Sequence, residues 1–155
     1  MLLHVRLVVA LSIVIATSCA VSAADQQCLS KDELANVARM ASTMGVGGAL
    51  NRCGRCLGDR YQPAVKAYEA TGMLVEFRRA EASIQKARPN FEYADDLVRM
   101  AARNYAMDMA ADCAACEKLA NTIEGLSTDG TRASFYEAAT AKVTEMPSFR
   151  ACPQE

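Results

Sequence analysis

The sequence is almost without histidine, since the single one in 155 residues is His4. Histidine is the usual base beside a catalytic serine or cysteine. Leu57 and Glu117 stand where a Cys-x-x-Cys-His haem attachment would need it. If the segment containing His4 is removed, Ser-His and Cys-His catalysis, histidine metal sites and covalent haem are all excluded.

Tryptophan is absent too, and four Phe and five Tyr are the only aromatic residues. Neither charge sign dominates. The first 24 residues contain one basic side chain, Arg6, so their removal leaves 16 of the 17 basic side chains against 18 acidic ones. The net charge is then about −2. Such a balance gives no electrostatic basis for binding nucleic acid or an anionic membrane. After residue 24 there is no long apolar run, Gly/Ser linker or low-complexity segment, so we expect one domain over 25–155 without a membrane span.

The first 24 residues have the composition of a cleaved signal peptide. A short start with one Arg is followed by the apolar run 7–16, and small residues then allow cleavage before Ala24 or Asp25. We therefore expect a periplasmic or secreted protein. Two alternatives remain: a retained membrane anchor, and lipidation of Cys19, although the leucine preferred three residues before such a cysteine is absent.

Apolar residues recur at helical spacing throughout residues 25–155, and no segment alternates like a strand. The sequence predicts an all-α, compact bundle of about five helices. Ser30 and Glu33 form a capping box at the first start. Small residues at every fourth position around Gly45 would let another helix approach closely, and Gly47 is a plausible kink. The expected helices cover about residues 30–52, 59–70, 73–87, 91–124 and 131–146.

The expected helix near 91–124 is unusually long because it contains no Gly or Pro until Gly125. It could be one helix or two helices broken near Asp112, and we favour one. Asp108 and Asp112 lie four residues apart in it, a spacing that would place both carboxylates on one face. A carboxylate pair can do acid–base chemistry, but the simpler interpretation is a solvated flank.

Six cysteines follow residue 24, and an even number in an exported domain indicates disulfides. Four of them form two Cys-x-x-Cys pairs, whose members share a helix face. Antiparallel helices would join Cys53–Cys116 and Cys56–Cys113 and leave Cys28–Cys152, one of fifteen possible pairings. The alternatives are a metal site of the four Cys-x-x-Cys thiolates, which an oxidising compartment disfavours, and a redox dithiol, which lacks its usual preceding strand. We expect no cofactor.

The leading hypothesis for function is an exported, non-enzymatic helical protein that binds a protein partner in the cell envelope. The first alternative is a carrier of a small apolar ligand, for which a cavity above about 300 Å³ would be needed. The second alternative is a thiol-based metal-binding or redox protein. A hydrolase is the least favoured class. The candidate cavity residues are Phe77, Ile84, Val98, Tyr105 and Phe135.

Overall fold

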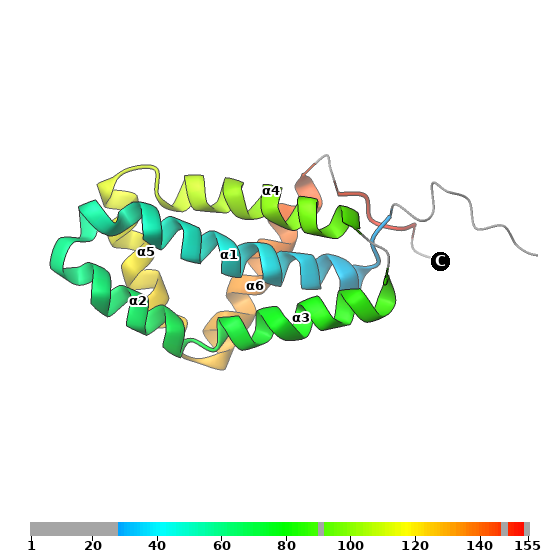
Figure 1. Ribbon diagram of the computed structural model, residues 1–155, viewed down its shortest axis with the longest axis horizontal. Coiled ribbons are helices and arrows are strands. Elements are labelled where there is room, and N and C mark those ends of the chain that lie inside the picture. The colour runs from blue at the N-terminus through cyan, green and yellow to red at the C-terminus, as the bar shows by residue number, and fades with distance from the viewer. Residues whose placement is uncertain (1–27, 90–91, 147–148, 154–155) are drawn as a thin grey trace, which may run out of the picture.

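The computed structural model describes residues 28–89, 92–146 and 149–153. The predicted signal peptide, its cleavage site and Cys19 lie outside these ranges. The predicted all-α class is confirmed (Figure 1). No helix in the described ranges has the length and apolar character needed to cross a membrane. The helices are α1 (Lys31–Leu57), the 3₁₀ turn η2 (Gly58–Arg60), α2 (Tyr61–Ala70), α3 (Met73–Ala87), α4 (Glu92–Met109), α5 (Cys113–Gly125) and α6 (Asp129–Glu145).

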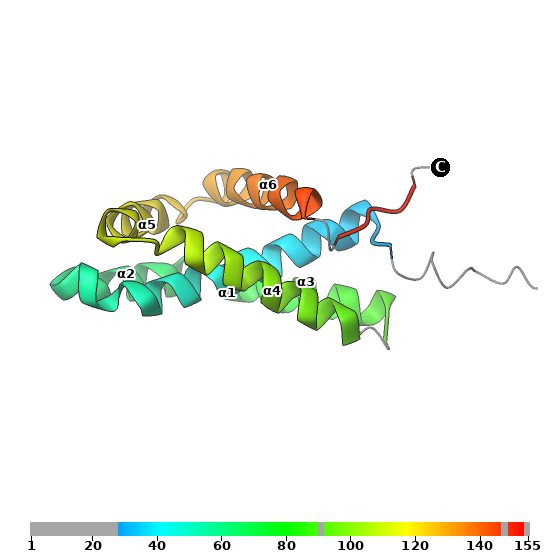
Figure 2. The ribbon, with the colours of Figure 1, turned by 90° about the horizontal axis from the view of Figure 1, so that it is seen from above.

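Helix α1 is the centre of the bundle and contacts all five other α-helices. Figures 1 and 2 show α4 along one side of it, α2 and α3 along another, and α5 and α6 stacked above. Its start is the predicted capping box: the Glu33 amide donates to the Ser30 hydroxyl at 3.2 Å, and the Ser30 amide donates to the Glu33 carboxylate at 2.7 Å. Both exchanges satisfy amides that the first turn leaves without helical partners.

The helix does not break at Gly47, because α1 runs without interruption for 27 residues. It also extends past the predicted end near Arg52, since Cys53 and Leu57 continue its buried side. The chain changes direction at Gly58, whose φ of 52° is a conformation that only glycine adopts easily. η2 and α2 follow directly, so α2 lies back against α1 and α5.

The single long helix favoured over 91–124 is corrected to two helices, α4 and α5, with residues 110–112 between them. Asp112 has an extended backbone, and its carboxylate accepts from the Ala115 amide at 2.7 Å. An aspartate that caps a new helix can interrupt a sequence that has no Gly or Pro. The turn carries α5 back across α1 and α2, where its cysteines can reach α1.

Two clusters of buried apolar side chains share α1. The first surrounds its N-terminal half with residues of α3, α4 and α6 and includes Val37 and Ile84. The second surrounds its C-terminal half with residues of α2, α5 and α6 and includes Val46 and Ile123. Each fully buried side chain of this size stabilises the fold by about 1.5–3 kcal/mol.

The two ends of the described chain are joined beside the start of α1. The disulfide Cys28–Cys152 links them, and Leu29 pairs with the C-terminal segment through its amide to the Arg150 carbonyl and its carbonyl to the Cys152 amide, at 2.8 and 2.9 Å. Arg88, just after α3, donates to the Cys28 carbonyl at 2.7 Å and forms an ion pair with Glu33. One guanidinium therefore connects the α1 cap, the end of α3 and the N-terminal segment.

Replacement of Glu33 by Gln should remove a contribution to the free energy of unfolding that depends on pH. Burial opposes ionisation of the Glu33 carboxyl, but hydrogen bonds from Arg88 and Ser30 and the charge of Arg88 outweigh it and lower its pKa below 4.5. A lowered folded-state pKa contributes stability above the unfolded-state pKa, and that stability is lost as pH falls through the folded value. We expect urea denaturation to give a loss of about 1–2 kcal/mol at pH 7 that shrinks as the pH falls through the folded-state pKa of Glu33. The exposed Glu69→Gln control should stay within about 0.5 kcal/mol throughout, and a pH-independent loss in the Glu33 variant would contradict the ion pair's role.

Candidate functional site

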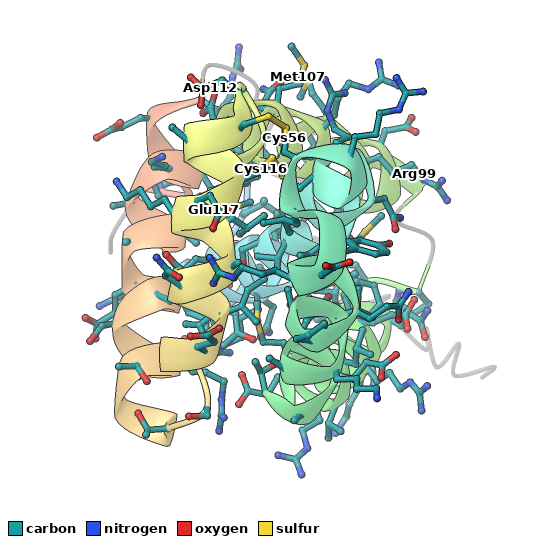
Figure 3. All side chains as sticks on the ribbon, turned by 90° about the vertical axis from the view of Figure 1, so that its left-hand side faces the viewer. Cys56, Arg99, Met107, Asp112, Cys116 and Glu117 are labelled. Carbon is teal, nitrogen blue, oxygen red and sulfur yellow. A yellow bond between two sulfur atoms is a disulfide. The ribbon has the colours of Figure 1, made fainter. Side chains whose placement is uncertain are left out.

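The two Cys-x-x-Cys segments lie together at one end of the bundle. Figure 3 looks onto this end, where Cys56 and Cys116 are seen between α5 and the end of α1. The bridges are Cys53–Cys116 and Cys56–Cys113, with Cα–Cα distances of 5.4 and 5.0 Å. These are the two bridges predicted from helical spacing, and Cys28–Cys152 is the pair that was expected to remain.

These disulfides bear on the metal and redox alternatives. A sulfur held in a disulfide is not a thiolate, and the thiolate is both the ligand and the nucleophile. Within the described ranges, no three His, Cys, Asp or Glu side chains are grouped so that they could hold a metal ion. The Cys53–Cys116 bridge is also inaccessible, because these residues are 0% and 2% exposed. The two bridges join the end of α1 to α5, and Arg60 of η2 further ties this end by pairing with Glu117 of α5.

The five predicted cavity residues fall into two groups. Ile84 and Val98 are buried in the first core cluster, and Phe77 packs against it. Their side chains pack in the core of the bundle. Tyr105 and Phe135 instead line the same surface groove.

This groove has a volume of about 390 Å³ and lies between the C-terminal half of α4, α5 and α6. Figure 2 shows α6 above α4, with α5 beyond the end of α4. Most of its wall is apolar or small, and Thr122 adds a hydroxyl. Its volume falls within the range of about 300–1,000 Å³ that is usual for small-molecule sites. The apolar and small lining residues are Tyr105, Met109, Ala115, Leu119, Phe135, Ala138 and Ala139.

Tyr105 is the fixed wall of the groove. Its hydroxyl donates to the Ala139 carbonyl at 2.9 Å, which connects α4 to α6 beneath the opening. Burial, together with the negative charge of Asp108, raises its pKa to about 12. The phenol therefore stays neutral at physiological pH and keeps this hydrogen bond. Because the hydroxyl is already bonded to the Ala139 carbonyl, Tyr105 offers a ligand mainly the apolar face of its ring.

The charged residues of the groove are two lysines and one aspartate. Lys118 from α5, Lys142 from α6 and Asp108 from α4 are all exposed and line its mouth. The Lys142 ammonium lies 5.7 Å from the centre of the Tyr105 ring, within the range of a cation–π contact. The mouth therefore has one more positive charge than negative.

The carboxylate pair considered for acid–base chemistry is not formed on one helix face. Asp108 lies on α4 at the groove, whereas Asp112 is the N-cap of α5 and accepts from the Ala115 amide. A carboxylate used as a cap serves the helix start. Of the two aspartates, only Asp108 lines the groove, together with Lys118 and Lys142.

Comparison of this chain with family models, with curated proteins and with solved structures found no match. The geometry of the groove is therefore the basis for assigning a function.

Sequence reasoning found the groove's two aromatic residues and missed its lysines. Lys142 lies three residues after Ala139 and four after Ala138, so its place on that face of α6 follows from helical spacing. Lys118 lies beside Leu119 on another helix. No local signal says that two lysines 24 residues apart meet at one opening, because that depends on how α5 and α6 pack.

Proposed function

We propose that this protein is an exported, non-catalytic binding protein that carries a small amphipathic molecule in the groove between α4, α5 and α6. The ligand has an apolar body and one anionic end. The observation that carries the proposal is a 390 Å³ groove with mainly apolar walls and two lysines at its mouth. This is the small-ligand alternative of the sequence analysis, with the ligand class extended to include an anionic group.

The three disulfides support the exported location. Such bonds persist in oxidising compartments such as the periplasm and the cell exterior, and are rare where thiols are kept reduced. All six cysteines of the described ranges are paired. The composition of residues 1–24 favours the same location.

The anionic end follows from the charges at the mouth. An apolar body would cover Leu119, Phe135 and the face of Tyr105, while its charged end would remain near water at the opening. Lys118 and Lys142 can each donate to a carboxylate there, and Asp108 would repel a second negative charge or a bulky anion. A head group with one negative charge fits two lysines and one aspartate, whereas a cationic head group would be repelled by both lysines.

A protein partner in the envelope remains a prediction, with less in the structure to favour it. The exposed large apolar side chains are distributed over three helices, α1, α3 and α4, and single exposed apolar residues are ordinary on protein surfaces. The groove, by contrast, gathers apolar residues from three helices in one recess. The exposed residues are Met44, Leu74, Val75, Met100 and Met107.

Calorimetric titration with decanoate, decanol and decylammonium tests the proposal. We expect decanoate to bind at least tenfold more tightly than decylammonium, a difference of about 1.4 kcal/mol. Ala138→Phe should fill the groove and weaken decanoate binding at least tenfold. Lys142→Gln should reduce the preference for decanoate over decanol, because it removes one of the two cations.

Two variants serve as matched controls. Ala141→Phe adds the same ring on the exposed surface of α6 outside the groove, and Lys86→Gln removes an exposed lysine of α3. Both should bind decanoate like the unmodified protein. Equal losses in the Ala138 and Ala141 variants, or no binding of decanoate at millimolar concentration, would rule out the groove as the site.

A further inference from the structure

A second recess lies on another side of the bundle, between α1, α3 and α6, with a volume of about 340 Å³. It shares none of its lining residues with the groove. Three arginines reach it from three helices: Arg39 from α1, Arg79 from α3 and Arg132 from α6. The one carboxylate in its lining is Glu76, so the recess has two more positive charges than negative.

Glu76 and Arg132 largely neutralise each other. The Arg132 Nε lies 3.4 Å from the Glu76 carboxylate, and its Nη1 donates to the Thr71 carbonyl at 2.5 Å. Arg132 thus holds the α2–α3 turn against α6. The two remaining guanidiniums, Arg39 and Arg79, form no ion pair with any residue that the structure describes.

Arg39 is held in place by uncharged neighbours, so no ion pair with a described residue neutralises its positive charge. Its Nη1 donates to the side-chain Oδ1 of Asn36 at 3.0 Å, and the side-chain Nδ2 of Asn36 in turn donates to the Ser83 hydroxyl on α3 at 3.2 Å. The guanidinium also lies 6.0 Å from the centre of the Tyr136 ring. These contacts leave further N–H groups of the planar guanidinium for an acceptor in the recess.

Tyr136 adds a buried hydroxyl for which the described residues provide no well-formed hydrogen bond. The residue lines the recess and is 6% exposed, and among the described residues no group meets its hydroxyl with hydrogen-bond geometry. Thr43 and Glu76 lie near enough to this hydroxyl to affect its ionisation. Burial, with a contribution from Glu76, raises the pKa of this phenol, so it remains a neutral donor. A buried hydroxyl without a well-formed hydrogen bond is unfavourable, and a bound acceptor would remove that cost.

We propose that this recess binds a tetrahedral oxyanion, phosphate or sulfate, either free or as the terminal group of a small molecule. Arg39 and Arg79 supply the charge and the paired N–H donors that such groups prefer. Tyr136 supplies a neutral donor from the inner side. A tetrahedral anion can accept from three directions at once, as donors on three helices require. The site is independent of the amphipathic ligand of the groove.

Titration with inorganic phosphate, sulfate, glycerol 3-phosphate and acetate at low salt tests this proposal. We expect phosphate or sulfate to bind with a Kd below about 1 mM, and acetate at least tenfold more weakly. Tighter binding of glycerol 3-phosphate than of inorganic phosphate would identify an organic monoester as the source of the group, and the reverse would identify the free ion.

Arg79→Gln and its neighbour Arg78→Gln form a matched pair, because both are exposed on α3 and only Arg79 lines the recess. Arg79→Gln should weaken phosphate binding about tenfold, and Arg78→Gln should leave it unchanged. Tyr136→Phe should weaken binding severalfold while leaving the thermal midpoint equal or higher, a separation that a purely structural tyrosine would not give. No binding of phosphate or sulfate at 1 mM, or equal behaviour of the two arginine variants, would overturn the proposal.

Discussion

Replacement of all four cysteines of the nested bridges by alanine should lower the free energy of unfolding by about 4 kcal/mol, far more than removal of either bridge alone. The bridge Cys53–Cys116 spans 63 residues. Closing a loop of that length lowers the entropy of the unfolded chain, which stabilises the folded protein by about 4 kcal/mol. Cys56–Cys113 closes nearly the same loop, with a span of 57 residues. When one bridge is present, the other restricts only a small ring and adds little on this model.

The two single-bridge variants should nevertheless differ from each other. Cys53 and Cys116 are buried, whereas Cys113 is exposed, so Cys53→Ala with Cys116→Ala also loses packing worth about 1–2 kcal/mol. Cys56→Ala with Cys113→Ala should be the milder pair. Urea denaturation of both double variants and of the quadruple variant measures this. Losses for the two bridges that simply add up to the quadruple loss would contradict the nested-loop explanation.

Replacement of Gly45 by Ala should destabilise the protein, although alanine favours helices. An added Cβ would lie 2.6 Å from the Tyr105 Cβ and 3.2 Å from the Ala102 carbonyl oxygen. Neither atom can move without shifting α4, so we expect a net loss of about 1–3 kcal/mol despite a gain in helix propensity of about 1 kcal/mol. Because Tyr105 is a wall of the groove, the same variant should weaken decanoate binding.

Gly47 in the same helix provides the matched control. A Cβ there would meet the Tyr68 hydroxyl at 3.6 Å, an ordinary contact. Gly47→Ala should therefore be neutral or stabilise the protein by up to about 1 kcal/mol. Thermal denaturation of both variants distinguishes close packing from propensity, and a stabilised Gly45→Ala variant would contradict the close approach of α1 and α4.

The elements that could be predicted are those with local signals. The capping box at Ser30 and the helix Met73–Ala87, which begins after Gly72, depend on residues next to them in sequence. The pairing of the two Cys-x-x-Cys segments could also be predicted, since residues three apart share a helix face. The break near Asp112 was considered but not favoured, because Asp112 is equally acceptable inside a helix or as a cap. The choice is made by the position of α5 against α1 and α2.

Only part of the candidate site could be predicted from the sequence, for a similar reason. Helical spacing identified Val98 and Tyr105 as facing inward, but it could not tell which meets another side chain and which borders a recess. That difference depends on how closely α6 approaches α4. The arginines of the second recess lie on three helices far apart in sequence, so only the packing of those helices brings them together.

Methionine methyl resonances would test most directly whether the groove is the binding site. Met109 lines the groove, whereas Met107, on the same helix, is 52% exposed and outside it. With ¹³C-methyl methionine in the disulfide-bonded protein, we expect a decanoate titration to shift the Met109 resonance and leave that of Met107 in place. An unchanged Met109 resonance at saturating decanoate, or a shift confined to Met107, would contradict the proposed function.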